Sequence, residues 1–303
     1  MLSPKLMRGA LCTLLRFVLL RCPVYRGGIR VAQSTFCKRL ANGNEPLVAR
    51  LRGGMKIQVH PNDYDGRSLL FWGANDRKIS WLCTALLRPG DTLLDIGANY
   101  GPVGLLAARR VGPEGRVHCF EPQPALADCI RASAALNGLS NLAVHALALS
   151  DRNGTLPLTV PAGHSGRASL CPGVCEGNSA AVPVRHAGDF LNSLALTSTR
   201  VIKLDVECHE EAVLSGAASF LKEAKPLAIV FESHDDGTPL LSRGPVELLR
   251  ALGYDIFQIR QRPLFRVQLR AVKTLADVET GYDFVACDDS RAGAELATVC
   301  SVV

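Results

Sequence analysis

The chain has 303 residues, of which 48% are hydrophobic and 20% are charged. This balance is typical of a folded globular protein, and no apolar run reaches the roughly 18 residues that a membrane-spanning helix needs. The length suits one large α/β domain with appendages or two small domains, so a disordered chain and an integral membrane protein are both disfavoured.

The net charge of +6 is unevenly distributed. Residues 1–60 contain 11 Lys and Arg residues and a single acid, Glu45, whereas the rest of the chain has 23 bases and 27 acids. The basic character therefore belongs to an N-terminal arm, residues 1–53. The acidic body gives no indication of nucleic-acid binding, and no nucleic acid is expected as a partner.

Within the arm, the first twenty residues are predicted to form a helix, with the apolar stretch Ala10–Leu20 interrupted by Arg16. The broken apolar run argues against a secretory signal peptide. We favour a helix that packs on the main domain. Two alternatives are an interfacial membrane helix, in which Lys5, Arg8 and Arg16 give a peripheral membrane contact, and a mitochondrial presequence if the source is eukaryotic.

Regular signals begin near Gly54. In chain order they predict a strand at 55–60, a helix at 80–87, a strand at 92–96, a helix at 103–111, a strand at 116–120, a helix at 124–137 and a strand at 142–149. Short apolar strands that alternate with helices are typical of a parallel sheet with helices on both faces. The sequence therefore predicts a doubly wound α/β fold.

Residues 154–185 interrupt this alternation. They are rich in Gly, Ser and Pro, and two short strands at 155–160 and 181–185 predict a β-hairpin insertion. The alternation then resumes with a strand at 200–206, a helix at 210–221, a strand at 227–231, a helix at 245–252 and strands at 254–259 and 282–286. We expect a main domain of residues 54–290, followed by a C-terminal tail, 291–303.

The eleven cysteines are odd in number and scattered, and several lie inside apolar segments, where a free thiol packs as a small hydrophobic group. This pattern favours a reducing compartment, and a cytoplasmic location, over a disulfide framework. Cys171 and Cys175 are flanked by His164 and His186, but their spacing is looser than that of a zinc knuckle. No metal site is expected.

A glycine-rich segment, Asp95-Ile-Gly97-Ala-Asn99-Tyr-Gly101-Pro-Val-Gly104, directly follows the strand at 92–96 and opens a helix. Glycines let the backbone turn sharply and approach a ligand closely, at the sheet edge where open α/β folds bind ligands. Glu121 ends the next strand, where a carboxylate can accept hydrogen bonds from both hydroxyls of a ribose. Together these features predict a ligand that contains a nucleoside.

Two nucleoside ligands are compatible with such a loop. A dinucleotide such as NAD(P) requires a glycine at the middle position, because the pyrophosphate approaches the backbone there. Here Asn99 occupies that position, and its side chain can instead bind the amino-acid end of S-adenosylmethionine. Asp95 can pair with the ammonium of the same ligand. The pattern therefore favours S-adenosylmethionine over a dinucleotide.

The strand at 200–206 brings an acidic cluster to the same edge of the sheet. Asp205, Glu207 and His209 are candidate catalytic residues, because methyl transfer needs a positioned acceptor and often a base. A metal site is a weaker alternative, and so is a buried salt bridge with Lys203 that has only a structural role. Glu232, at the end of the strand at 227–231, is a better candidate than His234 or Asp235.

The segments DIGANYGPVG, CFEPQPALADCIRASAALNGLSN, ALSDRNG, VIKLDVECHEEAVLSGA and IVFE resemble the FkbM-type methyltransferases, in the same order along the chain. The resemblance extends from about Lys56 to Cys287. It implies the class I methyltransferase fold, a Rossmann-like sheet of seven strands with one antiparallel, and S-adenosylmethionine as cofactor. Members with an assigned reaction are typically O-methyltransferases that act on natural products or sugars.

The resemblance also assigns roles to individual residues. It places Asp95, Gly97, Asn99 and Gly101 around the methionine portion, Glu121 on the ribose, and Ser150 and Asp151 at the adenine. It identifies the family's acidic cluster with Asp205, Glu207 and Glu210, preceded by Asp189. One position departs from the family pattern: Cys208 replaces a glycine, and it is strained if the backbone there needs a positive φ.

The sequence therefore predicts an S-adenosylmethionine-dependent methyltransferase that methylates a hydroxyl group of a small-molecule or glycan acceptor. Asp205 or His209 is expected to act as the base or as an orienting group. Two alternatives are a non-catalytic S-adenosylmethionine-binding module that its basic arm docks to a membrane or a partner, and an NAD(P)-dependent oxidoreductase. The sequence does not specify an oligomeric state.

Overall fold

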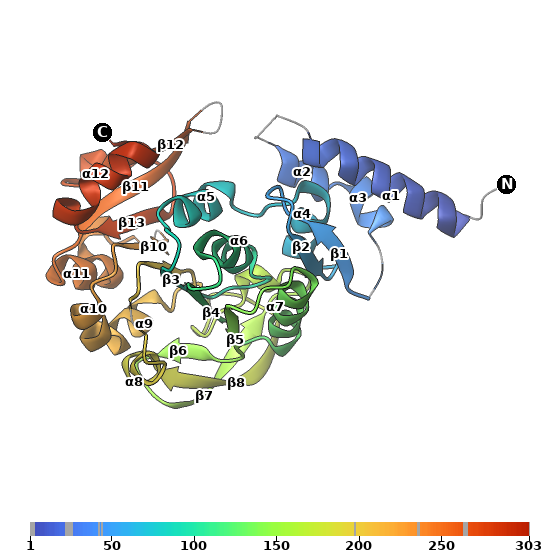
Figure 1. The fold of residues 1–303 in the computed structure, drawn as a ribbon. Coiled ribbons are helices and arrows are strands. Elements are labelled where there is room, and N and C mark those ends of the chain that lie inside the picture. The colour runs from blue at the N-terminus through green and yellow to red at the C-terminus, as the bar shows by residue number, and fades with distance from the viewer. Residues whose placement is uncertain are drawn as a thin grey trace.

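A computed structural model describes residues 4–21, 27–41, 43, 45–196, 198–234, 237–262 and 266–302. Its centre is a nine-stranded sheet (Figure 1). In spatial order the strands are β14 (Ser301–Val302), β12 (Arg266–Ala271), β11 (Asp255–Arg262), β13 (Asp283–Cys287), β10 (Ala228–Glu232), β9 (Val201–Leu204), β3 (Thr92–Ile96), β4 (Arg116–Phe120) and β5 (Leu142–His145).

The five strands from β5 to β10 are parallel, and β13 lies antiparallel between β10 and β11. These seven strands, with one antiparallel, confirm the expected class I methyltransferase fold. The sheet continues beyond them, because β12 forms a hairpin with β11 and β14 pairs with β12. Residues 291–302, expected to be a tail, belong to helix α12 (Asp289–Val299) and to β14.

Helices cover both faces of the sheet, because successive strand residues point to opposite sides. In β9, Val201 packs on one face and Ile202 on the other. The first face packs on α5 (Arg77–Ala85), α6 (Pro102–Val111), α12 and part of α7 (Pro124–Leu136). The second packs on α8 (Ala187–Ser193), α9 (Glu210–Gly216), α10 (Ala218–Ala224) and α11 (Gly244–Ala251).

Two predicted elements are each divided in the structure. The strand predicted at 142–149 is two strands: β5 ends at His145, the chain turns, and β6 (Ala148–Ser150) leaves the main sheet. A continuous apolar run does not reveal which sheet each half joins. The helix predicted at 210–221 is interrupted at Ala217, between α9 and α10.

The predicted hairpin insertion is present. Strands β7 (Gly154–Val160) and β8 (Asn178–His186) pair antiparallel, and β6 joins them as the third strand of a separate sheet. The loop between β7 and β8 contains a short 3-10 helix, η1 (Ser165–Arg167). Two further 3-10 helices are η2 (Leu240–Ser242) and η4 (Leu275–Asp277).

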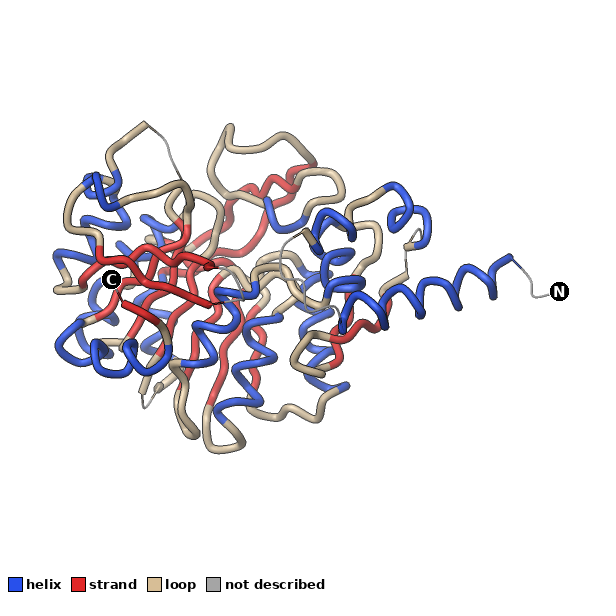
Figure 2. The backbone as a smooth tube through the Cα atoms, turned by 90° about the horizontal axis from the view of Figure 1, so that it is seen from above, coloured by secondary structure: helices blue, strands red, loops and turns tan. Residues whose placement is uncertain are grey.

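The N-terminal elements form a smaller unit beside the sheet. They are α1 (Pro4–Arg21), α2 (Gly28–Ala32), α3 (Thr35–Leu40), the hairpin of β1 (Leu47–Arg50) and β2 (Lys56–Val59), and α4 (Tyr64–Trp72). They share a hydrophobic core with α7. The tube view shows α1 extending away from the body toward the N-terminus (Figure 2). No helix in the described part of the chain is long and apolar enough to cross a membrane.

Candidate functional site

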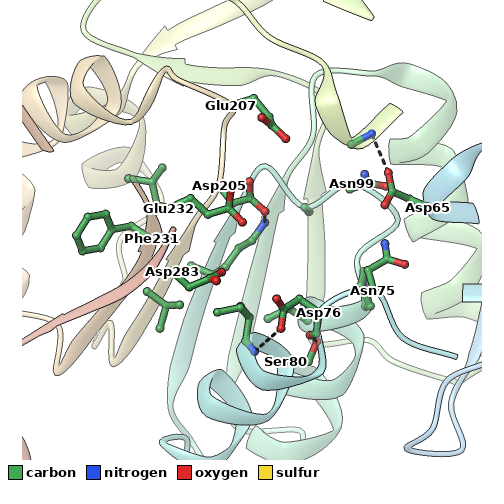
Figure 3. Close-up of a pocket in the computed structure, with 18 of the residues that line it drawn as sticks. Asp65, Asn75, Asp76, Ser80, Asn99, Asp205, Glu207, Phe231, Glu232 and Asp283 are labelled. Atoms are coloured by element: carbon green, nitrogen blue, oxygen red, sulfur yellow. Dashed lines mark hydrogen bonds and ion pairs between the residues drawn. The ribbon is translucent and has the colours of Figure 1, made fainter. Parts of the chain in front are cut away.

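Two adjoining cavities lie at the carboxyl ends of the parallel strands. The first, which we call the Glu121 cavity, lies beside β4, β6 and the insertion. The second, the Glu232 cavity, lies beside β9, β10 and α5 (Figure 3). Four residues line both cavities: Asn99, Gly166, Asp205 and Glu207. The two cavities therefore meet at one place.

The glycine-rich loop between β3 and α6 forms one wall of the Glu121 cavity. Gly97 has a φ of +74°, and a Cβ there would lie 1.8 Å from the backbone oxygen of Asp205, so only glycine fits. Gly101, also at φ +74°, precedes α6 as its N-cap and does not line either cavity. The loop is therefore held against the β9 turn by backbone contact.

Asp95 lies behind this loop. Its side chain is fully buried, its Oδ2 accepts a hydrogen bond from the Gly104 N–H at 2.9 Å, and its Oδ1 lies 3.6 Å from the Nζ of Lys203. Burial raises the pKa of Asp95, and Lys203 opposes that rise. Because Asp95 lines neither cavity, its position does not fit the expected pairing with a ligand ammonium. The carboxylate supports the start of α6 instead.

Glu121 lines the cavity that we named after it. Its Oε2 accepts a hydrogen bond from the Asn99 N–H at 2.8 Å, and its Oε1 accepts one from the Gln123 N–H at 2.9 Å. A carboxylate has about four acceptor positions, so these hydrogen bonds leave acceptor capacity for a ligand's hydroxyls. Burial raises the pKa of Glu121 to about 7 although both hydrogen bonds oppose the rise. Glu121, the residue predicted to bind the ribose, therefore faces the cavity and can still accept hydrogen bonds.

The rest of the Glu121 cavity is mainly apolar. Its apolar walls include Phe120, Leu147, Leu149, Leu158 and Leu170. These side chains come from β4, from the segment around β6 and from the insertion. No motif in the sequence indicates that these leucines line a cavity.

Ser150 and Asp151, predicted at the adenine, do not line either cavity. Ser150 is fully buried, with its hydroxyl 3.0 Å from Nε2 of His209, and Asp151 pairs with Arg152 at the surface. The physical reason is the departure of β6 into the insertion's sheet, which turns the preceding apolar residues toward the cavity. Any contact with adenine is expected from those residues instead.

Asp205 and Glu207, the candidate catalytic residues, line both cavities. The Nζ of Lys203 lies 3.2 Å from Oδ2 of Asp205 and donates a hydrogen bond to the Gly97 carbonyl oxygen at 2.5 Å. Burial raises the pKa of Asp205, and Lys203 partly opposes that rise. Burial, with added repulsion from Asp205 and Glu232, raises the pKa of Glu207 to about 7.

The turn after Asp205 has the backbone geometry that the family's glycine allows. Glu207 has a φ of +50° and Cys208 one of +74°. The expected strain at Cys208 is confirmed, because a side chain in the left-handed region costs energy. Residues of the insertion hold the turn: the Ser169 hydroxyl donates to the Glu207 carbonyl at 2.6 Å, and the Cys171 thiol donates to the Cys208 carbonyl at 2.9 Å.

His209 lines only the Glu121 cavity, and its Nε2 is engaged with Ser150. It shares that cavity with Asp205 and Glu207, whereas Glu232 lines only the Glu232 cavity. Another histidine, His234, lies among those acids. Its Nε2 is 3.2 Å from Glu232 Oε2 and 3.7 Å from Glu207 Oε2. The contact with Glu232 raises the pKa of His234 to about 8 although burial opposes it. Asp235 lies outside the described residues.

Three further carboxylates that line the Glu232 cavity were not anticipated: Asp65, Asp76 and Asp283 (Figure 3). Lys78 pairs with Asp283 at 2.9 Å and with Asp76 at 2.5 Å. Asp76 is the N-cap of α5, and Asp65 lies in the first turn of α4. Nothing in the sequence places the starts of these two helices beside β9. Asp283 begins an antiparallel strand and carried no motif at all.

Asp65 helps attach the insertion to α4. Its Oδ2 accepts a hydrogen bond from the Gly166 N–H at 3.0 Å. A Cβ at Gly166 would lie 2.3 Å from the same oxygen, so the loop approaches this closely only because residue 166 is glycine. Burial, with repulsion from Asp63, raises the pKa of Asp65 to about 7.

Within the described residues, no group of three or more His, Cys, Asp or Glu side chains is arranged to hold a metal ion.

Comparisons with solved structures give many matches of low identity. A precorrin-6Y C5,15-methyltransferase from Geobacter metallireducens is 15% identical, over 70% of this chain and 88% of that one, with a TM-score of 0.40. The O-methyltransferase TomG from Streptomyces achromogenes, in complex with S-adenosylmethionine, is 17% identical over 71% and 81%, with a TM-score of 0.39. A Thermotoga maritima O-methyltransferase is 12% identical over 81% and 93%, with a TM-score of 0.39.

The sequence comparisons are more specific. No curated protein matches the sequence. The family model described as the methyltransferase FkbM domain matches residues 95–256, more than half of the chain. This range contains the glycine-rich loop, Glu121, the insertion and the Asp205 turn. The chain therefore belongs to the FkbM methyltransferase family, a family of S-adenosylmethionine-dependent methyltransferases.

Proposed function

We propose that this protein methylates a hydroxyl oxygen of a small-molecule or glycan acceptor, with S-adenosylmethionine as the methyl donor. The observation that carries the proposal is the junction of the two cavities at Asn99, Asp205 and Glu207. A nucleoside bound in the Glu121 cavity would direct its other end toward this junction. An acceptor in the Glu232 cavity would reach the same point.

The residues present fit S-adenosylmethionine. Glu121 would bind the ribose hydroxyls, and the apolar walls around Leu149 and Leu158 would enclose the adenine. Asn99 Oδ1 is buried and lacks a hydrogen-bond partner within the described structure, so it would accept from the ligand's ammonium. The cofactor would supply a methyl group on a positively charged sulfonium, which the surrounding carboxylates stabilise.

Methyl transfer to a hydroxyl breaks a carbon–sulfur bond, forms a carbon–oxygen bond and releases the hydroxyl proton. Glu207 is the group that would take this proton, because it lies at the junction and its pKa of about 7 is close to a neutral working pH. Asp205, fixed by Lys203, would orient the hydroxyl. His209 also lines the Glu121 cavity, but its Nε2 is engaged with the Ser150 hydroxyl, so Glu207 is the group that we propose as the base.

The family membership removes the basis for an NAD(P)-dependent oxidoreductase. The non-catalytic alternative is distinguished by Asp205→Ala. The test incubates the wild-type protein and this variant with S-adenosylmethionine and extracts rich in hydroxylated metabolites, and mass spectrometry detects products that gain one methyl group.

We expect methylated products from the wild-type protein and none above background from Asp205→Ala, while calorimetry shows that both bind S-adenosylhomocysteine. Binding without any methylated product in the wild-type reaction would favour a binding module instead. Products methylated on nitrogen or carbon would retain the methyltransferase and overturn the assignment of a hydroxyl acceptor.

A further inference from the structure

Helix α1 has two apolar faces, and only one of them is covered. Cys12, Leu15 and Leu19 pack against the core of the N-terminal unit. On the other side, side chains at helical spacing are exposed by between 42% and 60%: Leu11, Leu14, Phe17 and Val18. The helix projects from the body, so the described structure leaves this outer face without a partner (Figures 1 and 2).

The elements next to α1 also carry exposed apolar side chains. The Arg16 guanidinium donates a hydrogen bond to the Val48 carbonyl oxygen at 2.8 Å, which joins α1 to β1. Of the twelve large hydrophobic side chains that are exposed among the described residues, eight lie in residues 11–48. We call the four on α1 the arm face: Leu11, Leu14, Phe17 and Val18. The other four lie on α2, α3 and β1: Val31, Phe36, Leu47 and Val48. Such a concentration marks an interaction surface rather than scattered surface residues.

Basic side chains accompany the arm face. The Arg21 guanidinium lies 3.7 Å from the ring centroid of Phe17. Arg30, Lys38, Arg39 and Arg50 are exposed on α2, α3 and β1. Residues 1–60 contain only one acid, whereas the rest of the chain is acidic. Apolar side chains surrounded by cations complement a lipid surface with negative headgroups, where the apolar groups enter the acyl boundary and the cations contact phosphate.

We propose that the arm face docks the protein onto an anionic lipid surface, with α1 lying in the interface. Because no described helix is suited to cross a membrane, the contact is peripheral and reversible. Docking would also position the Glu232 cavity. Helix α2 contributes Ile29 to the lining of that cavity, while its next residues, Arg30 and Val31, belong to the basic and apolar parts of the docking surface.

Because α2 lines the Glu232 cavity, docking cannot be tested by deleting the N-terminal arm. Deletion of residues 1–40 would remove Ile29 from the cavity and Gly28 from its close packing on Trp72. We therefore use the full chain with Leu14→Glu/Val18→Glu, which changes two residues one turn apart on the arm face. The matched control is Leu136→Glu/Val174→Glu, which places the same charges at exposed positions of α7 and the insertion loop.

Co-sedimentation with vesicles of equimolar phosphatidylcholine and phosphatidylserine measures the bound fraction. We expect wild-type and control proteins to pellet, and binding of Leu14→Glu/Val18→Glu to be weaker by about tenfold or more. Binding should also decrease with added salt and on pure phosphatidylcholine vesicles. Calorimetry with S-adenosylhomocysteine should give the same affinity for all three proteins, so a failure of docking does not affect the proposed function.

Three results would overturn the proposal. One is equal pelleting of wild-type protein and Leu14→Glu/Val18→Glu. Another is absence of pelleting together with a concentration-dependent dimer in light scattering that the double variant abolishes, because the arm face would then bind a second copy of the chain. Failure of the wild-type protein to pellet without any dimer would equally contradict it.

Discussion

The carboxylate of Asp63 joins two segments that are 102 residues apart: its Oδ1 accepts a hydrogen bond from the Ser165 N–H at 2.7 Å. Its Oδ2 accepts one from the Gly66 N–H at 2.9 Å, as the N-cap of α4. One buried side chain thus anchors the insertion loop next to Gly166, where the two cavities meet, and also caps the N-terminus of α4.

Asp63→Ala should therefore affect both stability and ligand binding. We expect the free energy of unfolding to decrease by about 1–3 kcal/mol, because two backbone N–H groups lose their acceptor. Affinity for S-adenosylhomocysteine should fall, since the loop carries Gly166 into both cavities. Urea denaturation and calorimetry measure the two effects. Asp63→Asn, which keeps one acceptor oxygen, is expected to be intermediate, and unchanged affinity in Asp63→Ala would show that the loop does not depend on this anchor.

Glu121→Ala tests the ribose site. Loss of charge-assisted hydrogen bonds to the hydroxyls should weaken binding of S-adenosylmethionine by about 1.5–3 kcal/mol, a factor of roughly 10 to 150. Calorimetry gives the affinity directly. Asp151→Ala is the control, because Asp151 lies at the surface with Arg152 and should leave affinity unchanged. The reverse ranking of the two variants would contradict the ribose assignment and would favour the contact of Ser150 and Asp151 with adenine that the family resemblance implies.

The pH dependence of turnover should report Glu207. A base must be deprotonated to accept a proton, so kcat/KM should rise with pH through about 7, the pKa to which burial and its acidic neighbours raise this carboxyl. Glu207→Gln should lose most of the activity and this ascending limb together. Retention of the limb in the variant would assign the proton transfer to another group, with His234 the next candidate by position.

Asp65 should make the folded chain less stable at neutral pH than at acidic pH. Its pKa is raised from 3.8 to about 7, mainly by burial, so between these values the folded state retains a proton that the unfolded state releases. The free energy of unfolding must then decrease as pH rises through this window. Asp65→Asn should raise Tm by about 2–4 °C at pH 8 and have little effect near pH 4. Equal shifts at both pH values in scanning calorimetry would contradict a titration effect.

Cys208→Gly should stabilise the protein. At φ +74° a side chain is unfavourable, and glycine removes that strain at some entropic cost, so we expect a gain of about 1 kcal/mol in the free energy of unfolding. Cys208→Ala separates strain from thiol chemistry, because alanine keeps the Cβ and lacks the sulfur. If both variants are equally stabilised in urea denaturation, the thiol and not the backbone conformation is responsible.

The sequence predicts most of the central fold because its signals are local. The strands at 92–96 and 116–120 have the predicted bounds, since each is a short apolar run that ends at a turn or just before Glu121. The run at 142–149 was harder, because apolar residues continue across the bend after His145. Its two halves join different sheets, and that depends on contacts with β8, far along the chain.

The candidate site was predicted in part. Gly97, Asn99, Glu121, Asp205 and Glu207 lie on strand-end loops with recognisable spacing, and all of them line a cavity. Asp95, Ser150 and Asp151 lie next to residues that line the cavities but do not line a cavity themselves. Spacing along the chain does not determine the direction of a side chain. Asp65, Asp76 and Asp283 could not be found in the same way, since they reach the Glu232 cavity only through tertiary packing.

The backbone contact between Gly97 and Asp205 has a consequence for engineering. A library at position 97 should return glycine alone, because any larger residue would separate the donor-binding loop from the strand that carries Asp205. The acids at 65, 76 and 283 come from other elements and line the Glu232 cavity, which is the acceptor side in the proposed function. On the proposed function, new acceptors should be accessible through Asp76 and Asp283, which line only the Glu232 cavity, while the donor half stays constant.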